Sequence, residues 1–559
     1  MVLKMALREF SHPKRGLYAF HSSPHDRNST EREMAAAKTK LTKGLLIMGV
    51  IGALFLILGC VSLIVFDDII HSQISSRLPL NKKGQTYNQW KAPKIPIYFQ
   101  VWAFDIVNHL EILEGKRPAV IQKGPYTYRE KRVKHDIRFF DNGTVYYKER
   151  RSFLFDRNLS VGPENDTVTS VNLAMVAAMT VLRYEPPLLK SLVEGAFQFF
   201  KESLFVETSV HDLLWGREDN ILKAIADIAK SFNVTLPLND TVGLLMGQNN
   251  SDTGEYLIHS GQKGLKDFAN IISWNRQRKL AVWSTDYANT INGSLGILFP
   301  PFVSKDHKQY IFSTDLVRSL TLTYQKDVEA HGIPLYKFYA APITFANVSI
   351  NPLNAGFCTP LGHCLPSGLL NMSNAYYGAP VVLSNPHFLF CDPDVVESVE
   401  GVQPDTEAYE SHLNIEPLTG ISMDADKRMQ INLHLQSIDG FRETYNLEPV
   451  VMPIMWLNES ATIPEHQAEQ FKTEVLNLIL ALTVVKYGLI GLGALLLVIA
   501  ASFPIVQKIR RKKTTDVAGG NIQRVQPTRK NPNNSNKNDD YDDPLLVPTS
   551  DSENNQNIY

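Results

Sequence analysis

The stretch GLLIMGVIGALFLILGCVSLIVF, at residues 44–66, decides the architecture of this chain because its 23 residues carry no charge. A second uncharged run of 20 residues, YGLIGLGALLLVIAASFPIV, occupies 487–506. About 20 apolar residues in a helix cross the roughly 30 Å hydrocarbon core of a bilayer. The sequence therefore predicts two transmembrane helices, at 44–66 and 487–506, on either side of a 420-residue segment, 67–486.

Basic residues flank these runs on the sides facing away from the central segment, and the first run is followed by Asp67 and Asp68. The basic residues are Arg32, Lys38, Lys40 and Lys43 before the first run and Lys508, Arg510, Arg511, Lys512 and Lys513 after the second. Lys and Arg are retained on the cytoplasmic face. Both tails, 1–43 and 507–559, are therefore expected in the cytoplasm, and 67–486 in the lumen or outside the cell. A cleaved signal peptide would need a shorter apolar core nearer the N-terminus.

Glycosylation sequons give an independent indication of this topology. Ten Asn-x-Ser/Thr sites lie in the central segment, against roughly three expected by chance, and such sites are modified only on the lumenal side. They are Asn142, Asn158, Asn165, Asn233, Asn239, Asn249, Asn292, Asn347, Asn371 and Asn458. The segment is therefore predicted to be a glycosylated ectodomain.

Cysteines are few in this predicted ectodomain. Cys60 lies in the first apolar run, which leaves Cys358, Cys364 and Cys391 outside it. Cys358 and Cys364 are close enough in sequence to close a short disulfide loop, with two buried thiols as the alternative, and Cys391 is expected to be a buried free thiol. So few cysteines disfavour a two-span, disulfide-rich trimeric channel, and the ectodomain must be held by its core. The net charge of −1 and the absence of a basic tract in this segment do not indicate a nucleic-acid partner.

Hydrophobic periodicity predicts both sheet and helix in the ectodomain. Alternation up to Phe155, interrupted by a hairpin turn at 141–143, indicates antiparallel sheet, and 429–435 is predicted to be a half-buried strand. A helical region is expected over 171–232. Within it, residues 188–202 have an apolar half wide enough to leave Leu188 and Phe197 for a ligand, although packing between two layers of the protein explains it equally well. Lys201, on the polar half, is a further candidate ligand residue, or simply a solvated surface lysine.

Catalytic and metal-binding signatures are missing from the sequence. It contains no Gly-x-Ser-x-Gly elbow, no His-Glu-x-x-His zinc helix and no Cys/His cluster. Asp392 and Asp394 near His387 suggest a membrane-tethered hydrolase, but acids beside a proline are more typical of turns. The chain is therefore predicted not to be an enzyme and to carry no metal or other cofactor.

Several stretches resemble, in order and spacing, the class B scavenger receptor family, and its lysosomal integral membrane proteins most of all. They are 124–129 (GPYTYR), 213–216 (LLWG), 291–293 (ING), 356–365 (GFCTPLGHCL), 378–380 (GAP), 386–388 (PHF), 417–421 (PLTGI) and 452–460 (MPIMWLNES). The resemblance implies an α+β ectodomain with an antiparallel β-barrel-like core, an apical helical bundle at 171–232 and an internal apolar tunnel. It also implies lipid, sterol or lipoprotein ligands, with lipid or sterol passing toward the membrane.

The lysosomal relative also carries a lumenal enzyme on a helix with a pH-sensing histidine. This chain has no histidine between His135 and His211, and Pro187 takes the aligned position, which weakens the expectation of pH-switched protein cargo. A protein-cargo receptor and a structural glycoprotein of the lysosomal membrane remain alternatives.

The C-terminal tail is polar and predicted to be disordered. Asp542, Leu545 and Leu546 form a dileucine-type signal of the kind that clathrin adaptors read. Together with the resemblance, this signal predicts a lysosomal or endosomal membrane protein, with the plasma membrane as the alternative.

Overall fold

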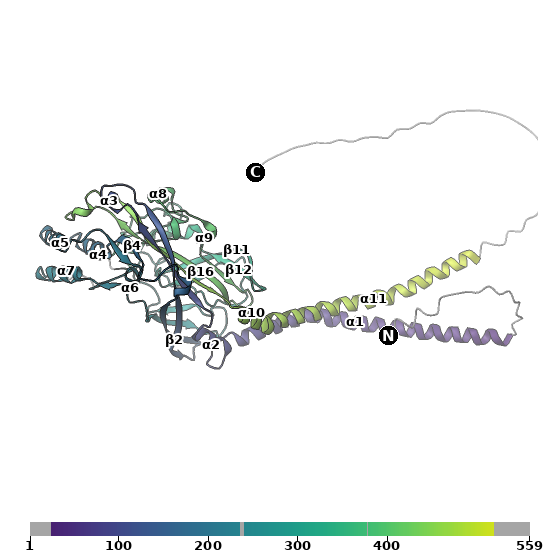
Figure 1. Ribbon diagram of the computed structural model, residues 1–559. Helices are drawn as coiled ribbons and strands as arrows, with labels where there is room; N and C mark the ends of the chain where they lie inside the picture. The colour runs from purple at the N-terminus through teal and green to yellow at the C-terminus, as the bar shows by residue number, and fades with distance from the viewer. Residues whose placement is uncertain (1–23, 235–239, 377, 519–559) are drawn as a thin grey trace, which may run out of the picture. The chain divides into compact units, whose positions relative to one another are not determined.

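The computed structural model describes residues 24–234, 240–376 and 378–518 of the chain (Figure 1). The chain divides into two compact units. One comprises residues 1–57 and 489–559, and the other comprises residues 58–488.

The smaller unit is formed, where it is described, by parts of helices α1 (Pro24–Arg77) and α11 (Asn477–Ala518). The two helices approach closely at glycines: a Cβ added to Gly52 would lie 3.0 Å from Leu496 Cβ and 3.1 Å from the Gly493 oxygen. Small residues permit such contacts between helices in a membrane. Over the described residues, two helices are long and apolar enough to cross a membrane, as the sequence predicted.

The larger unit is built on one 13-stranded sheet with antiparallel neighbours. The strands follow the order β10-β11-β12-β15-β16-β17-β1-β2-β3-β8-β9, with β14 paired to β16 and β13 to β14. Their bounds are β1 (Ile97–Ile106), β2 (Val120–Phe139), β3 (Thr144–Phe155), β8 (Ser251–His259), β9 (Ile271–Trp274), β10 (Gln309–Ser313), β11 (Arg318–Ala330), β12 (Ile333–Tyr339), β13 (Leu370–Asn371), β14 (Val381–Ser384), β15 (His412–Ile415), β16 (Ser422–Leu435) and β17 (Val450–Thr462).

Gly293 and Ser294 connect the two edges of this sheet. The Ile271 N–H of β9 donates a 2.8 Å hydrogen bond to the Gly293 oxygen. The Phe312 N–H of β10 donates to the Ser294 oxygen, also at 2.8 Å. The sheet is therefore nearly closed, and the predicted barrel-like antiparallel core is confirmed.

The β2–β3 hairpin turns at 140–143, where the sequence placed it. Gly143 has a φ of 83°, which a residue without a side chain adopts at little cost. The Asn142 Oδ1 accepts a hydrogen bond from the Thr144 N–H at 3.1 Å, which stabilises the turn. The hairpin prediction is confirmed.

Strand β16 differs from the prediction of a half-buried strand at 429–435. Gln430 and Asn432, expected to face solvent, are fully buried. Gln430 Oε1 accepts from the His387 N–H at 2.7 Å, and Gln430 Nε2 donates to Asn432 Oδ1 at 2.7 Å. Asn432 Nδ2 donates to the Val382 oxygen on β14 at 3.0 Å. Alternating polarity here marks a buried, hydrogen-bonded polar face and not a solvated one.

Helices cover the rest of the larger unit. They are α2 (Gln85–Lys91), α3 (His109–Ile112), α4 (Leu173–Leu182), α5 (Pro187–Phe200), α6 (Val210–Trp215), α7 (Asn220–Ser231), α8 (Pro393–Glu397), α9 (Thr406–Tyr409) and α10 (Glu465–Phe471). Short strands also pair here, β4 (Thr167–Val171) with β5 (Phe205–Ser209) and β6 (Arg217–Glu218) with β7 (Thr241–Val242). The predicted helical region therefore holds α4 to α7 but is interrupted by strands. Figure 1 shows α4, α5 and α7 at the end of the sheet opposite α2 and α10.

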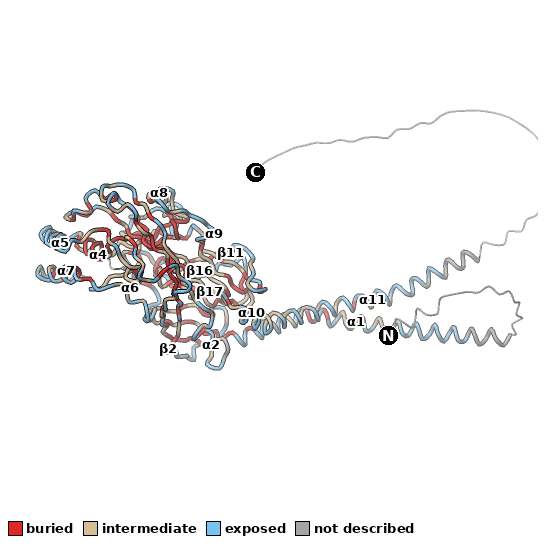
Figure 2. The backbone as a smooth tube through the Cα atoms, in the orientation of Figure 1, coloured by how far each residue is buried: buried red, intermediate tan, exposed pale blue. Residues whose placement is uncertain are grey.

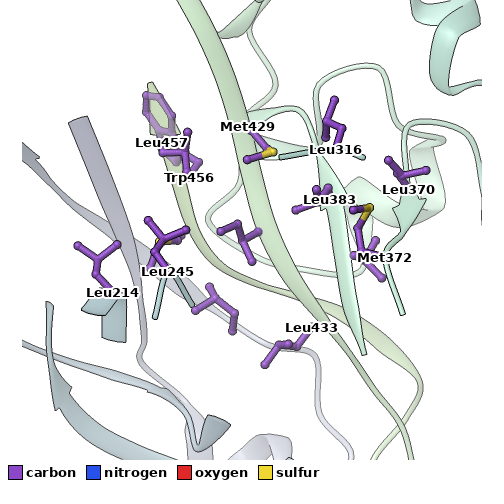
Figure 3. Packing of buried hydrophobic residues seen from close by; sticks show 14 of the residues in the cluster. Leu214, Leu245, Leu316, Leu370, Met372, Leu383, Met429, Leu433, Trp456 and Leu457 are labelled. Atoms are coloured by element: carbon purple, nitrogen blue, oxygen red, sulfur yellow. The ribbon is translucent and has the colours of Figure 1, made fainter. Parts of the chain in front are cut away.

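One hydrophobic core joins the helical region to the sheet (Figures 2 and 3). Leu214 of α6 and Leu245, which follows β7, belong to the same cluster as Leu383 of β14, Met429 of β16 and Leu457 of β17. All five are buried. The helices are therefore an integral part of the ectodomain fold, since they share its core.

The contact at Gly293 leads to a prediction about stability. Gly293 has a φ of 83°, and a Cβ there would lie 2.0 Å from the Tyr310 carbonyl oxygen. Gly293→Ala is expected to destabilise the protein by about 3 kcal/mol or more, because it adds a steric clash at the closure to backbone strain. The measurement is thermal unfolding of the full-length protein in detergent.

Gly247→Ala is the matched control, since Gly247 has a φ of 73° and its Cβ would meet nothing within 4 Å. Backbone strain alone is expected to cost about 1 kcal/mol there. Equal losses in the two variants would show that the contact across the sheet edges does not limit stability.

Candidate ligand-binding cavities

The first cavity lies inside the nearly closed sheet and has a volume of about 260 Å³. The apolar part of its wall comes from strands β1 and β10 to β12 and from the connecting segments before β10 and β11, and it includes Ile97, Leu295, Ile297, Ile311, Phe312, Leu316, Leu320, Leu322 and Phe338. The wall also contains charged residues, among them Arg132, Glu149, Glu410, Asp424, Asp426 and Arg428. The apolar side chains provide a surface for an apolar ligand.

The second cavity, of about 230 Å³, lies where helix α4 meets the sheet. Its apolar lining includes Leu173, Val176 and Ala177 of α4, Val381 and Leu383 of β14, Met429, Ile431 and Leu433 of β16, and Leu457 of β17. Helix α4 is apolar around most of its circumference, which lets it contribute to the core and to this wall at once.

The two cavities share part of their lining. Arg151, Asp315, Leu383, Lys427, Met429 and Glu459 line both of them. The cavities therefore adjoin, and four of the six residues at this junction are charged. We call Glu130, Arg132, Arg151, Asp315, Lys427 and Glu459 the junction network.

Arg151 is the centre of the junction network. Its Nε donates to Glu130 Oε1 at 2.8 Å, its Nη1 to Asp315 Oδ1 at 3.2 Å and its Nη2 to Glu459 Oε2 at 3.2 Å. Lys427 pairs with Asp315 and lies 3.5 Å from Glu459 Oε2. Arg132 Nε is 2.6 Å from Glu130 Oε1 and also pairs with Glu459. Three cations face three carboxylates, so the network carries no net charge.

Electrostatics keep two carboxylates of the junction network, Asp315 and Glu459, ionised. Burial by itself would raise the pKa of Asp315, but the charges of Lys427 and Arg151 outweigh it and hold the pKa well below its usual range. Burial would likewise raise the pKa of Glu459, but the positive charges of Arg132, Lys427 and Arg151 outweigh it and lower this pKa to about 2. Both groups therefore remain charged from neutral pH to about pH 5.

The residues considered for a hydrolase have separate partners. His387 is buried, its Nε2 donates to Gln122 Oε1 at 2.7 Å and its Nδ1 accepts from the Gln403 N–H at 3.1 Å. Burial lowers the pKa of His387 to about 4. Asp392 accepts from the Ser367 N–H at 2.8 Å and, together with Asp394, lies at the start of α8. Both ring nitrogens are thus engaged by glutamines and the backbone, not by these carboxylates.

Helix α5 presents an exposed apolar face, but not the one predicted. Phe197 is only 1% exposed and packs against Phe441, so its selection as a ligand-contacting residue is wrong. The reason is that α5 packs on α7 and on the core with Leu189, Val193 and Phe197. Leu188 is 63% exposed, as expected for a surface residue. Its exposed apolar neighbours are Leu192, Phe199 and Phe200, and Lys201 ends the helix in a left-handed conformation.

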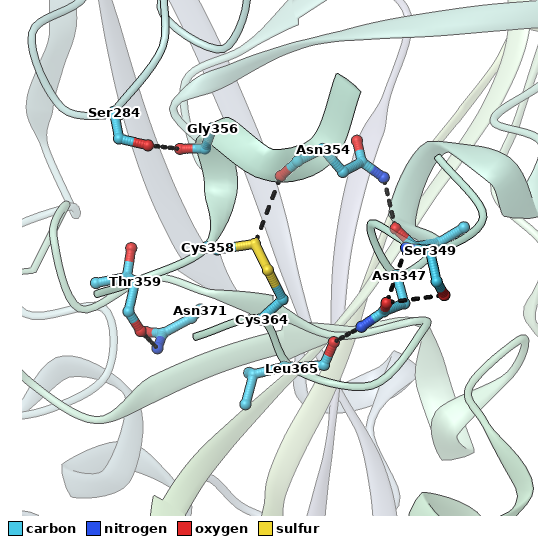
Figure 4. The surroundings of a disulfide bond; sticks show 11 residues. Ser284, Asn347, Ser349, Asn354, Gly356, Cys358, Thr359, Cys364, Leu365 and Asn371 are labelled. Atoms are coloured by element: carbon cyan, nitrogen blue, oxygen red, sulfur yellow. Dashed lines mark hydrogen bonds between the residues drawn. A yellow bond between two sulfur atoms is a disulfide. The ribbon is translucent and has the colours of Figure 1, made fainter. Parts of the chain in front are cut away.

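Cys358 and Cys364 form a disulfide with a Cα–Cα distance of 4.5 Å (Figure 4). Cys391 is a free, half-buried thiol whose pKa is raised by burial. The loop between the bonded cysteines contacts Asn371, whose Nδ2 donates to the Thr359 oxygen at 3.0 Å.

The sequon asparagines differ in exposure. Six are exposed, namely Asn142, Asn158, Asn165, Asn233, Asn249 and Asn292, whereas Asn347 and Asn371 are half-buried. Asn458 on β17 is a correction: it is 7% exposed and its Nδ2, the atom that would carry the glycan, donates to Asp426 Oδ1 at 3.1 Å. The folded strand therefore does not present this side chain to solvent. Asn239 and the sorting residues Asp542, Leu545 and Leu546 lie outside the described residues.

Sequence reasoning missed the junction network. Its members come from β2, β3, the β10–β11 turn, β16 and β17, so no spacing in the chain brings them together. The available signal was local: Glu459 stands inside an otherwise largely apolar, strand-forming stretch, where a charge requires a partner.

Comparison with known proteins agrees with this architecture. The profile of the CD36 family matches residues 50–503. Scavenger receptor class B member 1 of Sus scrofa is 34% identical over 87% of this chain and 91% of its own length. Lysosome membrane protein 2 of Mus musculus is 36% identical, and that of Homo sapiens 35%, each over 77% of this chain and 88% of the relative. The resemblance inferred from the motifs is therefore confirmed, and this chain belongs to the CD36 family.

Proposed function

We propose that this chain, a membrane protein of the scavenger receptor type, binds lipids, sterols or lipoproteins and passes lipid or sterol through its ectodomain toward the membrane. The observation that carries the proposal is the pair of adjoining apolar cavities in the ectodomain. The names of the relatives support it, since scavenger receptor class B member 1 is among them.

Cavity size supports a ligand that extends across the junction. Drug-sized ligands occupy pockets of roughly 300–1,000 Å³. Each of the two cavities, at about 260 and 230 Å³, is smaller than that range. A long apolar molecule therefore needs both cavities, and its middle lies beside Lys427, Asp315 and Met429.

The junction network supports a neutral cargo. Its six charges balance, so an added carboxylate would leave one uncompensated negative charge in a low-dielectric interior, which is costly. A hydroxyl or an ester oxygen adds no charge and can hydrogen-bond to Lys427 or to the carboxylates. Sterols and neutral lipids meet this requirement.

The exposed apolar face of α5, formed by Leu188, Leu192, Phe199 and Phe200, is the proposed contact surface for incoming ligands, with Lys201 at its end. These apolar side chains lie together on one helix, and a group of exposed apolar side chains on a protein surface is typical of an interaction site. Protein cargo is the second candidate for this surface, as in a cargo-sorting receptor. A structural glycoprotein is the third, supported by the exposed sequons.

We further propose that the protein resides in lysosomal or endosomal membranes with both tails in the cytoplasm. Asp542, Leu545 and Leu546 supply the signal for a clathrin adaptor. The lysosome membrane protein 2 relatives support this assignment, whereas the scavenger receptor relatives keep the plasma membrane as the alternative. Asp315 and Glu459 of the junction network stay charged at endolysosomal pH, so these two groups behave alike in either compartment.

Met429→Trp tests the route through the cavities, because Met429 lines both of them. The larger ring is expected to fill the junction and to reduce exchange of a fluorescent sterol by about tenfold or more, since overpacking costs about 1–3 kcal/mol. The measurement uses full-length protein in detergent and also counts co-purified lipid by mass spectrometry.

The control for this variant is Leu154→Trp, because Leu154 is 71% exposed on β3 and lines neither cavity. Unchanged sterol exchange in a folded Met429→Trp protein would contradict passage through the junction. Loss in both variants would point to an effect on the fold.

Leu188→Glu tests the α5 surface. A charge on this apolar face is expected to lower binding of fluorescent lipoprotein particles to cells by about fivefold or more, since buried contacts at interfaces are each worth about 1–2 kcal/mol. Ser191→Glu, on an exposed position of the same helix, is the control and should bind normally. Equal binding by both variants, normalised to the amount at the surface, would exclude this face as the contact site.

The double variant Leu545→Ala/Leu546→Ala tests the sorting signal. It is expected to move the protein from lysosomes to the cell surface, because an adaptor binds the two leucines in an apolar slot. The measurement is quantitative microscopy with surface biotinylation, and Val547→Ala serves as the control. If wild type and the double variant are equally present on the surface, the endolysosomal assignment fails.

A further inference from the structure

Arg318, at the start of β11, is a buried charge outside the junction network. Arg318 is 4% exposed, and its guanidinium carbon stands 3.7 Å from the centre of the Phe357 ring and 5.1 Å from that of Phe345. Its Nη2 reaches the Thr344 oxygen only at 3.4 Å, which is a weak contact. Its buried Nε has no hydrogen-bond partner among the described residues.

Arg318 also lacks a counter-charge. Arg132 and Arg151 each pair with carboxylates, whereas none of the described Asp or Glu residues forms an ion pair with Arg318. Burial lowers the pKa of Arg318 to about 9, so the group still carries its charge at neutral and acidic pH. An uncompensated buried cation costs several kcal/mol.

A small cavity lies beside this guanidinium. Its volume is about 30 Å³, and Arg318 and Thr359 are part of its wall. The buried Thr359 Oγ1 is a second polar atom without a partner in the described part of the chain. None of the residues lining this cavity is Asp or Glu. The rest of the wall includes the apolar residues Phe345, Phe357, Leu365, Leu369 and Leu370 and the polar residues Asn347, Asn354, His363 and Asn371. Figure 4 shows Thr359 and Leu365 near the disulfide between Cys358 and Cys364.

We propose that this cavity binds a monovalent anion of the size of chloride, held by the Arg318 guanidinium and the Thr359 hydroxyl. Both groups donate hydrogen bonds, and the positive site contains no competing carboxylate. A water molecule needs only about 10–15 Å³ and would satisfy the polar atoms but leave the charge of Arg318 uncompensated. Sulfate and phosphate bring more oxygens and charge than the cavity and its single arginine accommodate.

The bound anion would join two parts of the fold. Arg318 belongs to β11, and Thr359 belongs to the loop closed by the Cys358–Cys364 disulfide. A charge-assisted contact to both therefore fixes this loop on the sheet. The inference is independent of the lipid route, because the anion cavity shares no lining residue with the other two cavities except Phe345.

Thermal unfolding of the full-length protein in detergent tests the proposal. Sodium chloride or bromide is compared with sodium gluconate at equal ionic strength, since gluconate is too large for the cavity. The halides are expected to raise the midpoint by about 1–3 °C, because a ligand that binds only the folded state stabilises it. Arg318→Met and Thr359→Val are expected to lose this increment, and Arg276→Met, at an exposed arginine paired with Glu255, should keep it.

Several outcomes decide the question. Equal midpoints for wild type in halide and gluconate overturn the proposal, whatever the variants do. A halide increment that persists in Arg318→Met shows a nonspecific salt effect and overturns it too. If Arg318→Met does not fold, Thr359→Val distinguishes a specific anion site, where the halide increment is lost, from a nonspecific salt effect, where it persists. A bromide ion can be located by its anomalous signal in crystals of the full-length protein. Bromide in this cavity directly supports the proposal, and bromide found only at other places contradicts it.

Discussion

The junction network is the interaction on which the interior of this protein depends. Two adjoining cavities leave the nearly closed sheet without tight packing at its centre, and there Arg151 joins carboxylates from β2, β17 and the β10–β11 turn. A buried ion pair is not always more stable than an apolar contact, but removal of one partner costs about 3–5 kcal/mol. Each charge therefore fixes the positions of the others, and the strands that carry them keep their register around a hollow core.

The same pairing sets how the interior responds to pH. Carboxylates with a depressed pKa contribute stability that is present above their ordinary pKa and is lost only as the pH falls through the folded value, about 2 for Glu459. Asp315 and Glu459 therefore keep their charge between neutral pH and about pH 5. His387 behaves oppositely: its pKa of about 4 lies below the ordinary 6.5, so the unfolded chain binds the proton first. The folded state then loses stability as the pH falls below about 6.5.

Much of the architecture could be read from the sequence because it depends on local pattern. The apolar lengths predicted the two spans, and the Asn-Gly pair at 142–143 predicted the hairpin. Period alone could not show that β14 pairs with β16 in the sheet and that its Val382 and Ser384 accept hydrogen bonds from the buried Asn432. It also could not show that α5 turns Phe197 inward, since an apolar arc of half a helix does not specify which edge meets the core. The junction network was out of reach because its members come from five separate segments.

Closure of the sheet and the hollow interior have a common cause. The edge strands of an open sheet have unpaired backbone groups that need partners. Here Gly293 accepts a hydrogen bond from edge strand β9 and Ser294 accepts one from edge strand β10, so the sheet curves around its own inner face. The 13 strands enclose more volume than their inward side chains fill, which leaves the cavities. Apolar walls alone would let such an interior collapse in many ways. The charged residues of the junction network select one arrangement, because only that arrangement gives each of these six charges a partner.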